Sequence, residues 1–207
     1  MSDEEELLID REDYLAHGVH IGTKSQHNDM EEYIFHVKKN QLAVLNLEDT
    51  DKQIRKAAKK LAEYEPEDIL VVGRKDEAKE ALDEFANVTG VDSVIGRFMP
   101  GTLTNPQSDS FTEPELVLVT DPETDAQAID EAVQTNKYVI AIADSENELE
   151  GVDMAIPANN KSAKSLGMVY YLLARELGEE RGEEYELEAE DFQSEPVERE
   201  GEEEDEE

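Results

Sequence analysis

The side chains that could support catalysis are either absent from this sequence or too common to single out. There is no cysteine, which excludes disulfides, thiolate metal sites and cysteine nucleophiles. With 54 acidic residues among 207, any fold brings some carboxylates together by chance, so no acid can be named as a general base. Neither a GxGxxG nor a GxxxxGKS/T phosphate loop occurs, and no GxSxG nucleophile elbow is present. These absences predict a protein that is not an enzyme.

Histidines are the remaining candidates for metal chemistry, and all four lie within the first 36 residues. They are His17, His20, His27 and His36. The spacing of the first two is compatible with a metal site, but a glycine break follows them and no further ligand is clear. We therefore expect His17 to cap a helix end and His20 to hydrogen-bond within a turn, with no metal ion or cofactor bound.

The most informative stretch is residues 96–106, GRFMPGTLTNP, called the signature loop below. An arginine follows a predicted strand, a proline–glycine pair predicts a turn, and small hydroxyl and amide side chains come next. These residues are Arg97, Pro100, Gly101, Thr102, Thr104 and Asn105. Such groups suit the many short hydrogen bonds that position a protein on the sugars and phosphates of a nucleic acid. On chemistry alone, a rigid turn is an equally good interpretation.

Alternating apolar strands and amphipathic helices define the scaffold that must carry this loop. Strands are predicted at 68–73, 93–98, 115–121, 138–144 and 154–158, after a hairpin formed by 33–37 and 42–47. Helices are predicted at 11–16 after an Asp10 cap, from Thr50 or Asp51 to Glu65, at 75–90, at 122–136 with Pro122 in the first helical position, and at 161–177. The pattern predicts a three-layer, doubly wound α/β fold with a mostly parallel sheet.

The formal net charge of −35 is far larger than solubility in an ordinary cytoplasm requires. We expect an acidic extension at 1–10, a single α/β domain at 11–178 and an acidic, disordered tail at 179–207. Acidic residues also outnumber basic ones within the domain, which indicates adaptation to a cytoplasm of molar salt, where the Debye length falls to roughly 3 Å. The alternative is an acidic protein that binds basic partners or Ca²⁺.

Targeting and membrane signals are not evident in the sequence. The N-terminal MSDEEELLID lacks the basic and apolar regions of a signal peptide, and no run approaches the roughly 20 apolar residues of a membrane span. We expect a soluble cytoplasmic protein without a membrane partner.

Five ordered blocks of sequence resemble one family. The signature loop is similar to that of the small-subunit ribosomal protein two family, whose eukaryotic member is also called the laminin receptor precursor. The other blocks are LAHGVHIG, MEEYIFHVKKNQLAVLNLEDT, PELVLVTDPETDAQAIDEA and IPANNKSAKSLGMVYYLLARE, and together the blocks are distributed along residues 14–178. The spacing resembles the archaeal and eukaryotic branch, because bacterial members carry a projecting helical hairpin for which this chain has no room. Combined with the charge, this predicts a haloarchaeal member.

The resemblance implies a flavodoxin-like or Rossmann-like domain without catalytic activity. It implies a position on the solvent side of the small ribosomal subunit, near the neck between head and body, in contact with ribosomal RNA and adjacent ribosomal proteins and not as a free homo-oligomer. The implied RNA-facing residues outside the signature loop are His20, Gly22, Thr23, Lys24, Arg74, Lys161 and Lys164. The two lysines open the last predicted helix, whose N-terminal amides also favour phosphate.

Two departures from the family reduce the expected positive charge. The segment TKSQHNDM follows the HIG turn where many relatives have basic residues, and Glu48 and Asp49 stand where eukaryotic-type members have a basic pair. Binding to RNA must therefore depend on shape and hydrogen bonds, with the few bases gathered at the contact face. We predict that Lys24, Arg97 and Lys161 lie on one face. The alternative function is an α/β enzyme or sugar-phosphate-binding protein with a ligand at the strand ends.

Overall fold

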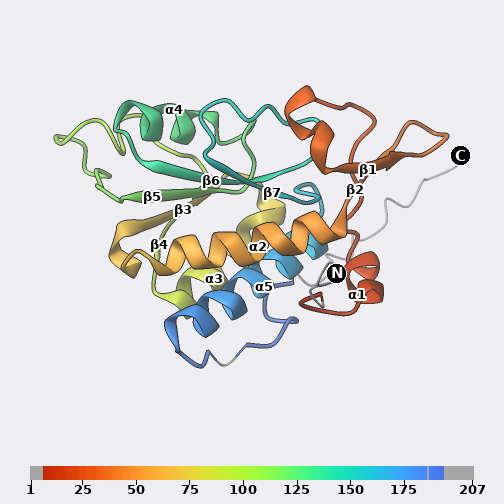
Figure 1. Ribbon diagram of the computed structural model, residues 1–207. Coiled ribbons are helices and arrows are strands. Elements are labelled where there is room, and N and C mark those ends of the chain that lie inside the picture. The colour runs from red at the N-terminus through yellow and green to blue at the C-terminus, as the bar shows by residue number, and fades with distance from the viewer. Residues whose placement is uncertain (1–6, 186, 194–207) are drawn as a thin grey trace, which may run out of the picture.

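The chain folds around a five-stranded parallel sheet in the computed structural model, which describes residues 7–185 and 187–193 (Figure 1). The strands are β3 (Ile69–Gly73), β4 (Asp92–Ile95), β5 (Leu116–Val119), β6 (Tyr138–Ala143) and β7 (Met154–Pro157). They lie in the order β4-β3-β5-β6-β7. When these five strands are numbered along the chain, this is the 2-1-3-4-5 order of flavodoxin-like folds. The predicted doubly wound α/β fold is confirmed.

Helices cover both faces of the sheet. On one face lie α2 (Leu47–Ala62), α3 (Lys79–Thr89) and α5 (Ala163–Arg181), and on the other lies α4 (Ala126–Gln134) (Figure 1). Alternate residues of each strand enter the two cores: in β5, Leu116 and Leu118 belong to the first, Val117 and Val119 to the second. Burial on both faces explains why these strands are continuously apolar.

Four helix starts differ from the sequence-based expectation. Helix α2 begins at Leu47, because the side chain of Asn46 accepts a hydrogen bond from the amide of Glu48. The expected caps point inward instead: Thr50 donates to the carbonyl of Pro157 at 2.6 Å, and Asp51 is 4% exposed. Asp51 accepts hydrogen bonds from the amide of Leu8 and the hydroxyl of Tyr14. These bonds join α2 to segments distant in sequence, so helix periodicity could not reveal them.

The other three starts lie later than predicted. Helix α3 begins at Lys79 and not at Lys75, because residues 76–78 form a turn of 3-10 helix. The prediction that Pro122 opens a helix is wrong, because residues 122–125 form a turn and α4 begins at Ala126. Helix α5 begins at Ala163 and not at Lys161. Both lysines that were expected to open it therefore remain at the start of the helix or just before it.

The predicted hairpin is confirmed as β1 (Ile34–Val37) and β2 (Ala43–Leu45), which pair antiparallel. A short helix, α1 (Arg11–Ala16), precedes it, and three short segments of 3-10 helix occur at Asn28–Tyr33, Pro66–Asp68 and Asp76–Ala78. Asp10 precedes α1 but makes no side-chain capping bond. No helix in the described part of the chain is long and apolar enough to cross a membrane.

The acidic tail was expected to begin at 179 and to be disordered, but α5 continues to Arg181 and the segment 187–193 packs back on it. Phe192 is 1% exposed and its ring lies 5.9 Å from that of Tyr171. Gly167 permits this close approach, since a Cβ atom there would lie 2.3 Å from the carbonyl oxygen of Phe192. One aromatic residue and one glycine thus hold a segment whose charge density alone indicates disorder. Residues 194–207 and 1–6 lie outside the described residues.

We predict that Gly167→Ala releases the segment 187–193 without disrupting α5. Alanine favours helix by about 1 kcal/mol over glycine, but its methyl group requires the backbone at Phe192 to move away. Limited digestion with a glutamate-specific protease should then cleave after Glu188 or Glu190 much faster than in the wild type. Phe192→Ala, which removes the anchor and leaves the helix unchanged, should give the same cleavage; unchanged resistance in both variants would contradict the packing.

Candidate nucleic-acid interface

The parallel sheet brings the predicted contact residues to one end of the domain. Because all five strands run the same way, the segments that follow them share the carboxyl end of the sheet. Arg74 follows β3, Arg97 follows β4, and Lys161 and Lys164 follow β7, and all four are exposed. Topology alone therefore gives these bases a common end of the molecule.

The predicted cluster of Lys24, Arg97 and Lys161 divides into two groups at this end. Thr23 donates to one carboxylate oxygen of Glu146 at 3.1 Å, and Lys161 forms an ion pair with the other, which brings Lys24 and Lys161 to the same corner. Arg97 follows the opposite edge strand. Four strand spacings of roughly 4.8 Å separate β4 from β7 by about 19 Å. The three bases share an end but do not form a single cluster.

The inner side of the signature loop is fixed to the core. Phe98 and Leu103 are 7% and 3% exposed and pack with the sheet face that α4 covers. The carboxylate of Glu131 in α4 accepts hydrogen bonds from the amides of Gly101 at 2.7 Å and Leu103 at 2.9 Å, and from the hydroxyl of Thr104 at 3.2 Å. Gly101 and Thr104 were expected to contact RNA, but these donors are used within the protein.

Thr102 also belongs to the inner side, which corrects its assignment as an RNA contact. It is 2% exposed and its hydroxyl donates to the carbonyl of Met99 at 2.6 Å. Its role is to close the turn at Pro100 and Gly101.

Hydrogen bonding decides the ionisation of Glu131. Burial would raise the pKa of this carboxyl group, but the amides of Gly101 and Leu103 and the side chains of Gln127 and Thr104 favour the charged form. The net result is a pKa below the usual value for glutamate. Glu131 is therefore a charged anchor for the loop.

The outer side of the signature loop presents a different set of groups. Arg97, Pro100, Thr104 and Asn105 are exposed, together with Met99 at 49%. The side-chain oxygen of Asn105 accepts from the amide of Gln107 at 3.1 Å, which orients the Asn105 side chain and leaves its amide nitrogen as a donor. The guanidinium of Arg97 and the amide of Asn105 are thus the donors on this side, and the Thr104 hydroxyl, which donates to Glu131, can still accept a hydrogen bond.

The first loop, residues 20–24, is only partly exposed. Gly22 is buried, and a Cβ atom there would lie 2.8 Å from the hydroxyl oxygen of Ser145, so its role is close packing and not RNA contact. Thr23 is partly buried and bonded to Ser145 and Glu146, whereas Lys24 is exposed. The ring nitrogen Nδ1 of His20 has no hydrogen-bond partner, contrary to the expected turn bond, and burial and nearby Lys38 lower its pKa.

The usual ligand crevice of this fold lies between β3 and β5, where the strand order reverses, and here it is closed. Lys75, after β3, forms an ion pair with Asp121, after β5. Asp125 accepts from the amides of Arg74 and Asp121, both at 3.1 Å. Burial raises the pKa of Asp125 to about 7. Sequence reasoning missed this network because nothing distinguishes two of 54 acids before their neighbours are known.

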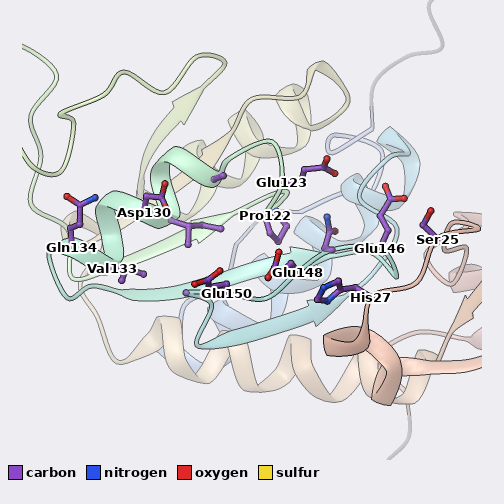
Figure 2. Close-up of a pocket in the computed structure, with 14 residues that line it drawn as sticks. Ser25, His27, Pro122, Glu123, Asp130, Val133, Gln134, Glu146, Glu148 and Glu150 are labelled. Atoms are coloured by element: carbon purple, nitrogen blue, oxygen red, sulfur yellow. The ribbon is translucent and has the colours of Figure 1, made fainter.

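A groove of about 960 Å³ lies beside this crevice, between α4 and the segment that joins β6 to β7 (Figure 2). Five carboxylate side chains line it, and it has no lysine or arginine in its lining. The acids are Glu123, Asp130, Glu146, Glu148 and Glu150. Phosphate would be repelled here. Within residues 7–185 and 187–193, no group of three or more histidine, aspartate or glutamate side chains is arranged to hold a metal ion.

Comparison with known proteins gives consistent matches. The family described as "Ribosomal protein S2" matches residues 14–111 and 107–179. The chain is 46% identical over 182 residues to the protein named "Small ribosomal subunit protein uS2" of Methanococcus maripaludis strain C5, covering 88% of this chain and 82% of the relative. The proteins of the same name from strains S2 and C6 are 46% and 45% identical over the same shares.

We predict that Glu131→Gln loosens the signature loop. The variant keeps the shape of the side chain but replaces one carboxylate oxygen by an NH2 group, which cannot accept the hydrogen bonds made to that oxygen. The free energy of unfolding should therefore fall by about 2 kcal/mol. Hydrogen exchange at the amides of Gly101 and Leu103 should accelerate. Asp130→Asn, an exposed change on the same helix, is the matched control and should leave both measurements near wild type.

The same variant tests the charge of Glu131. A depressed pKa gives stability that is present above the ordinary glutamate pKa of about 4.3 and is lost as the pH falls through the lower folded value. The stability difference between wild type and Glu131→Gln should therefore shrink on acidification below about pH 4. A difference independent of pH would show that the carboxylate charge does not hold the loop.

Proposed function

Because the chain belongs to the ribosomal protein S2 family and is thus a structural component of the small ribosomal subunit in the cytoplasm, not an enzyme, we propose that it binds that subunit's ribosomal RNA directly. The proposed contact is the outer side of the signature loop, supported by the exposed bases at the carboxyl end of the sheet. The residues concerned are Arg97, Pro100, Thr104 and Asn105, with Arg74, Lys24, Lys161 and Lys164 as further contacts.

The observation that carries this proposal is the two-sided construction of the signature loop. Its inner donors are bonded to Glu131, so the loop is rigid before it meets a ligand. Its outer side has an exposed arginine, Arg97. None of the ion pairs in the described part of the chain involves this residue. An arginine on a prearranged backbone, beside the Asn105 amide and the Thr104 hydroxyl oxygen, suits phosphate and sugar contacts, because little loop entropy is lost on binding.

We also propose contact with adjacent small-subunit proteins near the neck between head and body, with no free homo-oligomer. Val133 on α4, which is 53% exposed and lies outside the signature loop, is an apolar side chain available for such a contact. The alternative of a sugar-phosphate ligand at the strand ends has little support, since the crevice is closed by Lys75 and Asp121 and the adjacent groove is lined by carboxylates.

We predict that Arg97→Ala weakens binding to a transcript of the small-subunit ribosomal RNA on the order of tenfold. Loss of one phosphate contact should also reduce the slope of log K against log salt by about one. Filter binding over a series of KCl concentrations measures both quantities.

The matched control is Lys137→Ala, which removes one charge just before β6, at the opposite end of the sheet. It should leave both the affinity and the salt slope close to the wild-type values. Equal effects of the two substitutions would sink the proposed contact at the signature loop, and failure of the wild-type chain to co-sediment with small subunits in high salt would contradict the function itself.

We further propose that the acidic surface is adapted to molar salt. At about 0.1 M salt the Debye length is roughly 10 Å, so neighbouring surface carboxylates repel, whereas at about 1 M it is roughly 3 Å and the repulsion is screened.

The melting temperature, followed by circular dichroism, should therefore rise steeply from about 0.1 M to about 1 M KCl. Sucrose at matched osmolarity is the control, because it excludes volume without screening charge. A melting temperature indifferent to KCl would rule out this adaptation.

A further inference from the structure

The hairpin of β1 and β2 exposes an aromatic side chain that the fold does not need for its core. Phe35 is 65% exposed, more than any other large apolar side chain in the described residues, and Val37 is 46% exposed. The hairpin projects from the edge of the domain beyond β2 (Figure 1). Exposed apolar groups gathered on a projection indicate contact with something outside the chain.

A register irregularity directs Phe35 outward. Ile34 pairs with Leu45 and His36 pairs with Val44, so Phe35 is the extra residue of a β-bulge. Bulges bend a strand and re-aim a side chain, and they often occur at functional sites. The ring of His36 meets that of Phe35 edge-on, with centroids 5.3 Å apart, and steadies it. The exposure of Phe35 is therefore a feature of the backbone and not a loose side chain.

The charge of the hairpin differs from that of the chain as a whole. Residues 33–47, YIFHVKKNQLAVLNL, contain no acid, although acids make up 54 of the 207 residues. Lys38 and Lys39 are exposed at the tip, and none of the ion pairs in the described residues involves them. A strongly acidic protein thus presents an aromatic ring beside two free ammonium groups.

Backbone hydrogen bonds join the hairpin to the first loop. The amide of Gly22 donates to Ala43 at 3.0 Å, that of Ala43 to Thr23 at 2.8 Å, and that of Leu45 to His20 at 2.9 Å. Lys24 therefore lies next to the base of the hairpin, and Lys161 is connected to the same loop through Glu146. The hairpin extends one corner of the proposed interface.

We propose that this hairpin is an RNA contact in which Phe35 stacks on an unpaired base while Lys38 and Lys39 bind the flanking phosphates. Aromatic rings stack on bases of any identity, and single-stranded RNA offers the unstacked bases required. Stacking neutralises no phosphate, so it persists in salt that removes the counterion-release contribution of lysine. The two lysines and the absence of acids favour a polyanion over a protein as the partner.

This inference rests on the proposed function, and site-directed photocrosslinking in assembled small subunits separates the two. The photoreactive residue p-benzoylphenylalanine replaces Phe35, Thr104 in the signature loop or Val133 in α4, each in the full chain. We expect crosslinks to ribosomal RNA from positions 35 and 104 and not from position 133.

The other outcomes are decisive in different ways. RNA crosslinks from position 104 with only protein crosslinks, or none, from position 35 would overturn the hairpin contact alone. Equal RNA crosslinking from position 133 would overturn it as well, because the reaction would then be unspecific. Absence of RNA crosslinks from both 35 and 104 would overturn the RNA-binding function together with the hairpin contact.

Binding to a small-subunit ribosomal RNA transcript distinguishes stacking from charge. Phe35→Ala should weaken binding on the order of tenfold with an unchanged salt slope, and Phe35→Trp should retain affinity. The double variant Lys38→Ala/Lys39→Ala should lower the slope by about 1.4 to 1.8, whereas Lys52→Ala/Lys56→Ala on α2, also an exposed pair, should not. Wild-type affinity in Phe35→Ala, or equal slopes for the two lysine pairs, would overturn the proposal.

Discussion

Buried carboxylates that accept backbone amides hold the separate parts of this structure together. Glu131 fixes the signature loop to α4, and Asp125 joins the segments after β3 and β5. Asp51 does the same for the N-terminal segment, since it accepts from the amide of Leu8 at 2.7 Å and the hydroxyl of Tyr14 at 3.0 Å. Such a bond contributes about 1.5–3 kcal/mol where the carboxylate is ionised, and a lost partner leaves a buried amide unsatisfied. A few acids of the many thus determine where the loops lie.

Two buried carboxylates close the crevice between β3 and β5, where this fold ordinarily binds ligands, so the proposed functional surface lies elsewhere. In flavodoxin-like sheets the strand-order reversal opens a crevice for a cofactor, but Lys75 and Asp121 bridge it here and Asp125 ties its two sides. The same carboxyl end still gathers the loops after every strand. In the proposed interface, contacts with RNA come from the two edges of that end, the signature loop at one edge and the hairpin with the first loop at the other. A fold shared with enzymes serves here as a rigid support.

The sequence was sufficient for the features that depend on periodicity and on local turn chemistry. Apolar strands such as 69–73 and the turn at Pro100 and Gly101 follow from patterns within a few residues, so the α/β class and the parallel sheet could be predicted. Helix α2 was placed correctly but its start was not, because Thr50 and Asp51 bond to distant segments and Asn46 takes over the cap. Such pairings depend on tertiary geometry that no local pattern contains.

The sequence indicated the segments of the candidate site but not the orientation of their residues. Gly22 and Thr102 belong to the right segments yet face inward, and the bulge that exposes Phe35 depends on the strand register with β2. Glu131 could not be found at all from sequence, because the amides it accepts lie about 30 residues away and its neighbour Asp130 looks equivalent. Burial separates these two acids, and only the fold determines burial.

A chain of net charge −35 should repel RNA, which is a polyanion. Two factors reduce this repulsion: the positions of the acids and the short range of their electric field in salt. Residues 33–47 and 93–108 contain no acid, and both belong to the proposed interface. At about 1 M salt a carboxylate more than roughly 3 Å beyond these segments is largely screened from a bound phosphate. Attraction by bulk positive charge is lost under the same conditions, but so is most of the repulsion. In the proposed interface, short-range groups such as Arg97, Thr104 and Phe35 then decide recognition, and a rigid backbone beneath them matters more than the sign of the protein's total charge.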